Sequence, residues 1–396
     1  MRRLPITVPI PPSRPQPPWR RVAAVGVAGL AIALVLLGLQ LMRWGPDPTS
    51  VFFVGQSFGL DEALAARGEV VETTASSGYD GQWFLGLAYD PLLLGDLTDG
   101  FDMPRYRAGR PLMAIAGWLL AGGGLLPIWL GLLAVGPLAA GLGAAASARL
   151  LAGFGLNRWL GVGFALVPGV AVGVTHATAE PLGLALAVLG VSLALRPGRA
   201  WPAGLAFAGA GLTKESYLLF GVVAAAVVLA DPAGPLRARL RRAATIVLPG
   251  VAALAAWLGW VVLTVPGSDA DAKAADALEL PLVGWAGMAG DVVAGSWVAD
   301  APVGPLGLIL MFGSLLLAVA GIAAGLRRPG LPGWTGLVFG LYSLCLSAYL
   351  LGHFLSSMRA LAPCVVAGAL ALAAHATRPS RDRTPAQRPA ESDAAA

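Results

Sequence analysis

Long runs of apolar residues, almost free of charge, divide the sequence from residue 22 to residue 376. A helix needs about 20 mainly apolar residues to cross the roughly 30 Å hydrocarbon layer of a bilayer. Lipid offers the backbone no hydrogen-bonding partner, so such runs must form helices. The sequence therefore predicts an all-α polytopic membrane protein with about ten transmembrane helices, in the runs Val22–Met42, Pro127–Leu151, Trp159–Thr175, Thr178–Leu195, Trp201–Leu212, Ser216–Ala230, Ala243–Val265, Val303–Leu326, Trp334–Gly352 and Arg359–Ala376.

The composition excludes several other classes of protein. Hydrophobic residues make up 57% of the chain and charged residues 12%, whereas a soluble domain has about 25% charged residues. The basic residues gather between the apolar runs, which argues against a nucleic-acid partner. Cys345 and Cys364 both lie within apolar runs and indicate no disulfide or metal framework. The glycine-rich segment 141–146 is interpreted as a helix-packing surface, although it loosely resembles a dinucleotide loop.

The distribution of basic residues predicts the topology. The run Pro111–Leu120 is too short to cross, and we expect it to lie along the outer interface as a short helix over residues 110–122. With ten crossings, 19 of the 27 Lys and Arg residues fall on one side, as the positive-inside tendency requires. We therefore expect a multi-pass protein of the plasma membrane with both termini in the cytoplasm.

The predicted parts of the chain follow from this topology. Residues 21–376 form the membrane domain, between cytoplasmic tails at 1–20 and 377–396 that are rich in Pro, Arg and Ala and predicted to be disordered. Two long loops lie outside. Residues 43–109 hold ten of the 22 acidic residues, and residues 267–302 hold six more.

The segment SSGYDGQWFLGLAYDP, from Ser76 to Pro91, places carboxylates and aromatic rings in the first outer loop. In one interpretation, Asp80 is a base at the membrane surface, with room for a substrate left by glycines at 78 and 81 and aromatic anchors after them. In the other, the aromatic residues form an interfacial belt and Asp80 caps a helix that begins at Gly81. The residues alone leave both interpretations open.

The layout resembles the GT-C superfamily of membrane glycosyltransferases, which use polyprenyl-phosphate-linked sugars. The segments Gly78–Gln82, Tyr89–Pro91, Arg105–Arg107 and Leu212–Glu215 are most similar to bacterial GT-C-like proteins implicated in making cell-surface glycopolymers. The resemblance implies a bundle of about ten spans, with juxtamembrane helices in the long first extracytoplasmic loop. Asp80 would match the catalytic aspartate of that loop, which takes a proton from the acceptor hydroxyl.

The function implied by the resemblance is sugar transfer from a polyprenyl-phosphate-linked donor to a glycan, glycolipid or protein acceptor outside the cell. A lipid-linked glycan polymerase or ligase of another fold is the nearest alternative, and a non-catalytic transporter or flippase component is a second. The sequence requires no cofactor. Binding of a divalent metal is an alternative, with His176 and Glu180, or Asp80 and Asp90, as its ligands.

Polar and charged residues near the outer face are the candidates for binding substrate. Lys214 and Glu215 join two short apolar runs. The two residues would either take part in the function or only form an ion pair with each other. Arg359 ends the last outer hairpin and would either bind a phosphate through its planar fork or extend to lipid headgroups. The full set of substrate-binding candidates is Tyr79, Gln82, Asp90, Arg105, Arg107, Arg110, His176, Glu180, Lys214, Glu215, His353 and Arg359.

Overall fold

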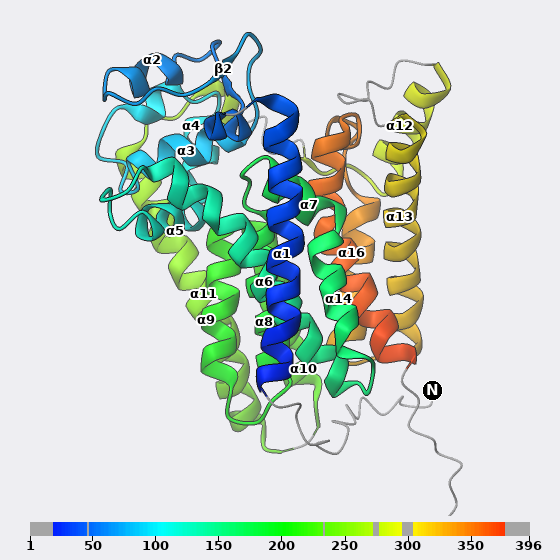
Figure 1. The fold of residues 1–396 in the computed structure, drawn as a ribbon. Coiled ribbons are helices and arrows are strands. Elements are labelled where there is room, and N and C mark those ends of the chain that lie inside the picture. The colour runs from blue at the N-terminus through cyan, green and yellow to red at the C-terminus, as the bar shows by residue number, and fades with distance from the viewer. Residues whose placement is uncertain (1–18, 46, 233, 272–276, 295–303, 377–396) are drawn as a thin grey trace, which may run out of the picture.

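The computed structural model describes residues 19–45, 47–232, 234–271, 277–294 and 304–376, and within these ranges the chain is almost wholly helical. A bundle of upright helices carries a smaller lobe, residues 47–110, at one end (Figure 1). We call this the outer lobe. Helix α1 begins and helix α16 ends at the opposite end of the bundle (Figure 1). The parts of the predicted tails at 1–18 and 377–396 lie outside the described residues.

The elements follow the order of the apolar runs. The α-helices of the described ranges are α1 (Trp19–Trp44), α2 (Leu60–Ala65), α3 (Gly81–Tyr89), α4 (Pro104–Ala108), α5 (Leu112–Leu120), α6 (Ile128–Gly153), α7 (Pro168–Thr175), α8 (Glu180–Ala194), α9 (Ala200–Thr213), α10 (Leu218–Ala230), α11 (Leu236–Thr264), α12 (Val283–Ala294), α13 (Gly304–Arg327), α14 (Leu331–Leu344), α15 (Ala348–Leu351) and α16 (Phe354–Ala376). Short 3₁₀ helices are η1 (Pro48–Phe52), η2 (Leu97–Gly100), η3 (Arg158–Leu166) and η4 (Glu215–Tyr217), and two strands, β1 (Val54–Gly55) and β2 (Thr73–Thr74), pair in parallel.

Five of these helices are long and apolar enough to cross a membrane, namely α1, α6, α11, α13 and α16. Together η3 and α7 would make a sixth span, bent by 55°. The bend falls just before Pro168, whose ring restricts the residue ahead of it. Helices α8, α9, α10 and α14 have 15, 14, 13 and 14 residues, which at about 1.5 Å per residue falls short of roughly 30 Å. The all-α membrane fold is confirmed, while ten crossings stays a prediction.

Small residues bring α1 and α6 into close contact. A Cβ atom added to Gly29 of α1 would lie 2.5 Å from the Cβ of Ala144, and one added to Gly26 would lie 3.1 Å from the carbonyl oxygen of Gly141. Helices in lipid associate through such close backbone approach. The glycine-rich segment 141–146 is therefore a helix-packing surface, as the sequence predicted.

Side-chain hydrogen bonds and a tight turn shape the outer lobe. The Gln82 side chain accepts a 2.9 Å hydrogen bond from the main-chain nitrogen of Gly55 and donates one of 2.8 Å to the carbonyl of Ser77. Gly78 has a φ of +76°, and a Cβ there would lie 2.4 Å from the Phe53 carbonyl oxygen. The prediction that glycines at 78 and 81 leave room for a substrate is wrong, because protein backbone fills both places.

Two of the three aromatic residues of α3 are buried in the hydrophobic core that the outer lobe shares with the bundle. Trp83 is 3% exposed, and its ring centre lies 5.4 Å from that of Phe58 and 5.1 Å from that of Phe101. Phe84 is also buried, at 5% exposure. The interpretation as an interfacial belt or anchor is therefore wrong for these two rings, whereas the third ring, that of Tyr89, is half-buried. The burial of Trp83 and Phe84 instead fixes α3, and with it the residue just before α3, against the rest of the lobe.

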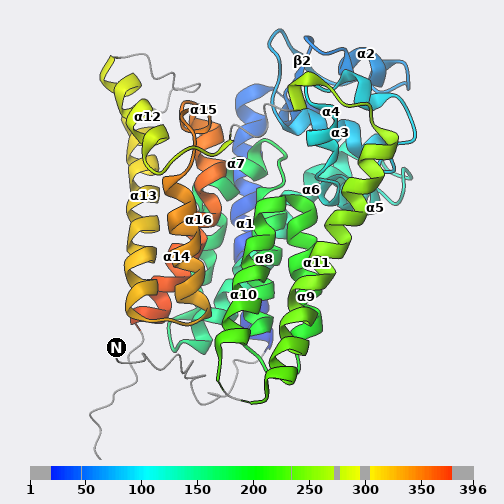
Figure 2. The ribbon, with the colours of Figure 1, turned by 180° about the vertical axis from the view of Figure 1, so that it is seen from behind.

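Helix α5 lies where the outer lobe meets the bundle (Figure 1). Helix α5 has nine residues, so the prediction that this run is a separate short helix is confirmed. It packs against α3 and α6. Helix α12, from the second predicted outer loop, lies at the same end of the bundle as the outer lobe (Figure 1). Figure 2 shows from behind that α11 reaches the lobe, where Arg105 Nε of α4 donates a 3.0 Å hydrogen bond to the Val265 carbonyl.

Candidate functional site

Asp80 lies directly before α3, where the outer lobe meets the bundle. Its carboxylate makes no capping hydrogen bond with the start of α3. Instead, Oδ1 accepts a 2.8 Å hydrogen bond from Arg107 Nη1, and Oδ2 accepts one of 2.6 Å from Arg359 Nη1. The capping interpretation is therefore wrong. The Asp80 carboxylate, 22% exposed, joins an arginine of the outer lobe to an arginine of the last helix.

Arg107, in α4, is held by a second carboxylate of the same lobe. Its Nε and Nη2 atoms donate to Asp102 Oδ1 and Oδ2 at 2.9 and 2.8 Å. The guanidinium also lies 5.6 Å from the centre of the Trp83 ring. A two-pronged Arg–carboxylate pair fixes direction as well as distance. Asp102 thus aims the remaining guanidinium nitrogen of Arg107 at Asp80.

Arg359, in α16, lies between two carboxylates. Nη1 binds Asp80 and also donates a 3.2 Å hydrogen bond to Tyr79 Oη. Nε lies 2.9 Å from Glu180 Oε2, an ion pair without the alignment of a hydrogen bond. The side chain is 8% exposed, so the interpretation of Arg359 as an arginine that extends to lipid headgroups is wrong. Its third nitrogen, Nη2, makes no hydrogen bond with the residues that the structure describes.

Glu180 is the first residue of α8, followed by Pro181, as expected of an ordinary helix start. It is also fully buried and ionically paired. Oε2 accepts a 2.6 Å hydrogen bond from Thr178 Oγ1, and Oε1 lies 3.4 Å from Lys214 Nζ. A buried carboxylate is costly unless it is paired. Glu180 therefore needs the two cations that approach it from α16 and from the end of α9.

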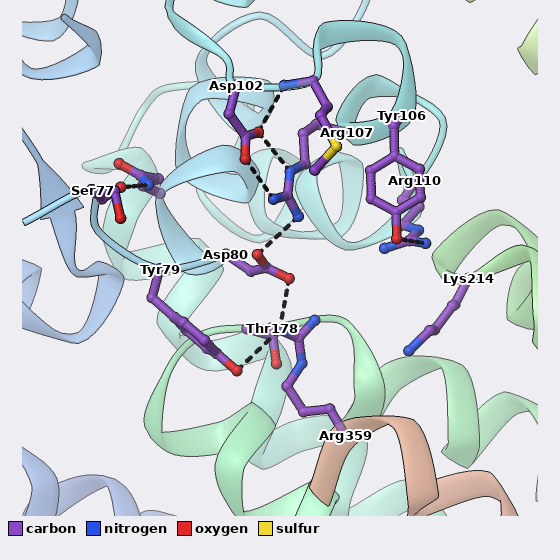
Figure 3. Close-up of polar contacts among 12 residues, drawn as sticks. Ser77, Tyr79, Asp80, Asp102, Tyr106, Arg107, Arg110, Thr178, Lys214 and Arg359 are labelled. Carbon is purple, nitrogen blue, oxygen red and sulfur yellow. Dashed lines mark hydrogen bonds and ion pairs between the residues drawn. The ribbon is translucent and has the colours of Figure 1, made fainter. Parts of the chain in front are cut away.

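These residues form one alternating chain of charges, which we call the outer charge network. Figure 3 shows Arg107 pointing down from the lobe onto Asp80, Arg359 reaching up from α16, and Lys214 approaching from one side. The network combines three carboxylates with three cations, so its formal charges balance. In order along the chain of contacts, its members are Asp102, Arg107, Asp80, Arg359, Glu180 and Lys214.

Burial and charge fix the protonation of two lobe residues, Asp80 of the network and its neighbour Tyr79. Burial alone would raise the pKa of the Asp80 carboxyl, but Arg107 and Arg359 outweigh it and hold this pKa well below its usual value. Burial raises the pKa of the Tyr79 hydroxyl to about 12. At neutral pH, Asp80 is therefore a carboxylate and Tyr79 a neutral phenol.

A second ion pair joins the lobe to the bundle beside the network. Arg110 Nε and Nη2 donate to Glu215 Oε2 and Oε1 at 3.0 and 2.8 Å, and Nη2 also donates to Tyr106 Oη at 2.7 Å. Glu215 thus pairs with Arg110, while its neighbour Lys214 pairs with Glu180. The interpretation of Lys214 and Glu215 as a self-satisfying pair is wrong, since each residue binds a distant partner.

Eight predicted substrate-binding residues lie outside the outer charge network. Tyr79 binds its Arg359, and Arg110 and Glu215 form the pair beside it, while the other five lie elsewhere in the lobe and the bundle. Gln82 holds the outer-lobe turn described above. Asp90, at the far end of α3 from Asp80, accepts hydrogen bonds from two main-chain N–H groups of the following turn. Arg105 binds carbonyls at the end of α11. His176 stacks on an aromatic ring of the lobe, with centres 4.9 Å apart, and His353 is exposed between α15 and α16.

The sequence analysis missed several polar residues of this region. Asp102 and Thr178 precede their partners by five and two residues, a local spacing that could have drawn attention to them. Tyr217, directly after Ser216 in η4, is fully buried. Its hydroxyl has no hydrogen-bond partner among the described residues. Lys214 Nζ lies 5.8 Å from the centre of the Tyr217 ring, so the Tyr217 side chain lies beside the network.

Within the described ranges, no three His, Cys, Asp or Glu side chains gather as a metal site would require. Asp80 and Glu180 each bind arginine, which occupies the oxygens that a cation would use.

The fold and the site together define an all-α membrane protein with a balanced charge network at one end of its bundle. Neither a protein-family model nor a curated protein sequence matches the chain.

Proposed function

We propose that this protein is a GT-C-like glycosyltransferase, which moves a sugar from a polyprenyl-phosphate-linked donor to a glycan, glycolipid or protein acceptor at the outer face of the plasma membrane. The observation that supports the proposal most is the contact of Asp80 with Arg107 and Arg359. It joins a carboxylate able to take a proton to cations able to hold a departing phosphate, at the end of a membrane bundle.

The donor phosphate is assigned to Arg359 and Lys214. Among the described residues, Arg359 Nη2 has hydrogen-bonding capacity left over, and Lys214 Nζ, with its three N–H groups, has Glu180 as its single ion-pair partner. Figure 3 shows the two side chains converging below Asp80. Cations placed where a leaving phosphate gains charge stabilise the transition state more than they stabilise bound substrate.

The transfer conserves atoms and charge in one displacement. The acceptor oxygen bonds to the anomeric carbon of the sugar while the bond from that carbon to the phosphate oxygen breaks. The phosphate leaves with the bonding electrons and stays on the lipid, beside Arg359 and Lys214. The proton of the acceptor hydroxyl passes to Asp80, and general-base help of this kind is worth about 10²–10⁴-fold.

The low pKa of Asp80 makes its carboxylate a weak base while both arginines bind it. A phosphate bound by Arg359 would compete with Asp80 for the same guanidinium. Loss of part of that contact would raise the basicity of Asp80. Donor binding would therefore prepare the base, so that the carboxylate becomes active only when there is a sugar to transfer.

The alternatives from the sequence predict different outcomes in a binding and transfer assay. The purified protein would be titrated with a short-chain polyprenyl phosphate, and transfer would be followed with lipid-linked sugars from a membrane extract. We expect Arg359→Lys to weaken polyprenyl phosphate binding, and Asp80→Asn to bind it but not to transfer sugar. Binding without any transfer by the wild type would favour a transporter component. Undiminished transfer by Asp80→Asn would exclude the proposed base.

The matched control is Asp96→Asn. Asp96 is a carboxylate of the same lobe, also paired with an arginine, Arg67, but 76% exposed. This variant should transfer sugar at the wild-type rate. A loss as large as that of Asp80→Asn would attribute the effect to general damage to the lobe.

A further inference from the structure

The opposite end of the bundle holds a second cluster of charge, independent of the proposed transferase site. Helix α11 begins with four arginines in its first two turns, Arg237, Arg239, Arg241 and Arg242. Their side chains serve two different purposes. Arg239 donates to the carbonyls of Leu229 and Asp231 at 2.7 and 2.9 Å, and Arg242 donates to the Ala194 carbonyl at 2.9 Å. These two arginines satisfy carbonyls at the ends of neighbouring helices.

Arg237 and Arg241 are different. They are exposed and four residues apart, so they lie on the same face of α11. Neither side chain makes an ion pair or a hydrogen bond with any residue in the described ranges. Two arginines at the end of a membrane helix thus present unused, strongly hydrogen-bonding charge to the surroundings.

An apolar groove of about 400 Å³ begins at Arg241 and follows α11 toward the middle of the bundle. It runs from Arg241 to Ala252, about 16 Å at 1.5 Å per residue. Its lining includes Trp201, Arg241, Ala244, Leu248, Pro249 and Ala252.

The local sequence explains why α9 and α11 meet closely beside this groove. Gly204 of α9 faces α11 so closely that an added Cβ would lie 2.3 Å from the Thr245 carbonyl oxygen and 3.2 Å from Pro249 Cγ. Trp201, one turn earlier, is 58% exposed. Trp is favoured where apolar surface meets the polar headgroup layer. The groove therefore has an apolar floor, an aromatic side and a cation at its outer rim.

We propose that this groove binds an anionic phospholipid, with Arg241 bonded to the headgroup phosphate and one acyl chain lying along α11 as far as Ala252. The charge selects an anion, since Arg241 has no carboxylate partner in the described ranges and its planar fork fits phosphate oxygens. The apolar lining selects a ligand with a hydrocarbon chain attached. A basic pocket at a membrane surface is the usual setting for such lipid recognition.

Native mass spectrometry of the intact protein tests the site, with phosphatidylglycerol compared against phosphatidylcholine. We expect tighter retention of phosphatidylglycerol by the wild type. Arg241→Gln should lower that affinity by about tenfold, the loss of one charged hydrogen bond. Ala252→Trp, which fills the groove and leaves Arg241 in place, should also weaken binding. Both positions are exposed, so both variants should fold.

Arg237→Gln is the matched control, since it removes the same charge from the same face but one turn beyond the groove. It should keep most of the affinity. Equal losses of affinity in Arg237→Gln and Arg241→Gln would mean that the lipid is held by unspecific electrostatic attraction. Unchanged binding by Ala252→Trp would mean that no acyl chain lies in the groove. Displacement of the lipid by inorganic phosphate would mean a site for a free anion. Each of these three results would overturn the proposal.

Discussion

Arg359 Nη1 donates a 2.6 Å hydrogen bond to Asp80 Oδ2, across 279 residues of sequence. The contact joins the first loop of the chain to its last helix. The same guanidinium reaches the fully buried Glu180, so a single side chain links the outer lobe, α8 and α16.

Arg359→Gln should strongly destabilise the protein. The change leaves buried Glu180 with Lys214 as its remaining cation, at 3.4 Å. Breaking a buried ion pair by removing one partner costs about 3–5 kcal/mol. Denaturant unfolding in detergent would measure the loss. Arg67→Gln, which removes an exposed pair of the outer lobe, should change stability little. Equal effects of the two variants would contradict the structural importance of Arg359.

The ion pairs of Asp80 should make the stability of the folded protein depend on pH. Its pKa is lower in the folded protein than in the unfolded chain, where an aspartate has a pKa of about 3.9. The stability that its arginine contacts contribute is therefore fully present above about pH 4–5 and is lost as the pH falls toward the folded pKa. Thermal unfolding between pH 3 and pH 7 should show this loss in the wild type. Asp80→Asn should show a smaller fall over the same range, and a fall of undiminished size would assign the acid response to other groups.

Asp80→Asn should also lower sugar transfer by about 10²-fold or more if Asp80 is the base. Asparagine has nearly the same shape, and Arg107 keeps Asp102 while Arg359 keeps Glu180. The variant should therefore be folded and inserted. Initial rates of transfer, divided by the amount of folded protein, give the comparison. In contrast, Asp90→Asn should act only through the turn after α3, which its carboxylate holds.

Cysteine labelling tests the predicted sides of the membrane. Single cysteines at Ser76, Ser268 and Ser380 would be introduced after replacement of Cys345 and Cys364. Ser76 and Ser268 are exposed, while Ser380 lies outside the described residues. An impermeant reagent added to intact cells should label the first two positions and not the third. Labelling at Ser380 would place the carboxyl terminus outside and change the number of crossings.

The helices were largely predictable because their cause is local. Long apolar runs form helices in lipid whatever surrounds them, and Val22–Met42 lies within α1 as expected. The observed helix boundaries differ from the predicted ones where charged residues next to an apolar run are also compatible with a helix. Helix α11 begins at Leu236, seven residues before the predicted run, because arginines favour helical backbone as much as apolar residues do.

The contacts of the site could not be deduced from local patterns. Trp83 and Phe84 are residues typical of an interfacial belt, yet both are buried in the hydrophobic core that the outer lobe shares with the bundle. Lys214 and Glu215 are adjacent and opposite in charge, but each pairs with a residue more than 30 positions away. Residue types indicated which groups would carry charge at the lobe end of the bundle. Which charges meet depends on how the helices pack.

The position of Arg359 in the last helix has a consequence for biosynthesis. A chain is synthesised from its amino terminus, so Glu180 is made long before residue 359 has been translated. Until then, this buried carboxylate lacks its closest cation and Asp80 has one arginine instead of two. A chain cut short before α16 would keep nearly every other helix and still lack a complete charge network. The outer charge network thus becomes complete and electrically balanced only after α16 has been made.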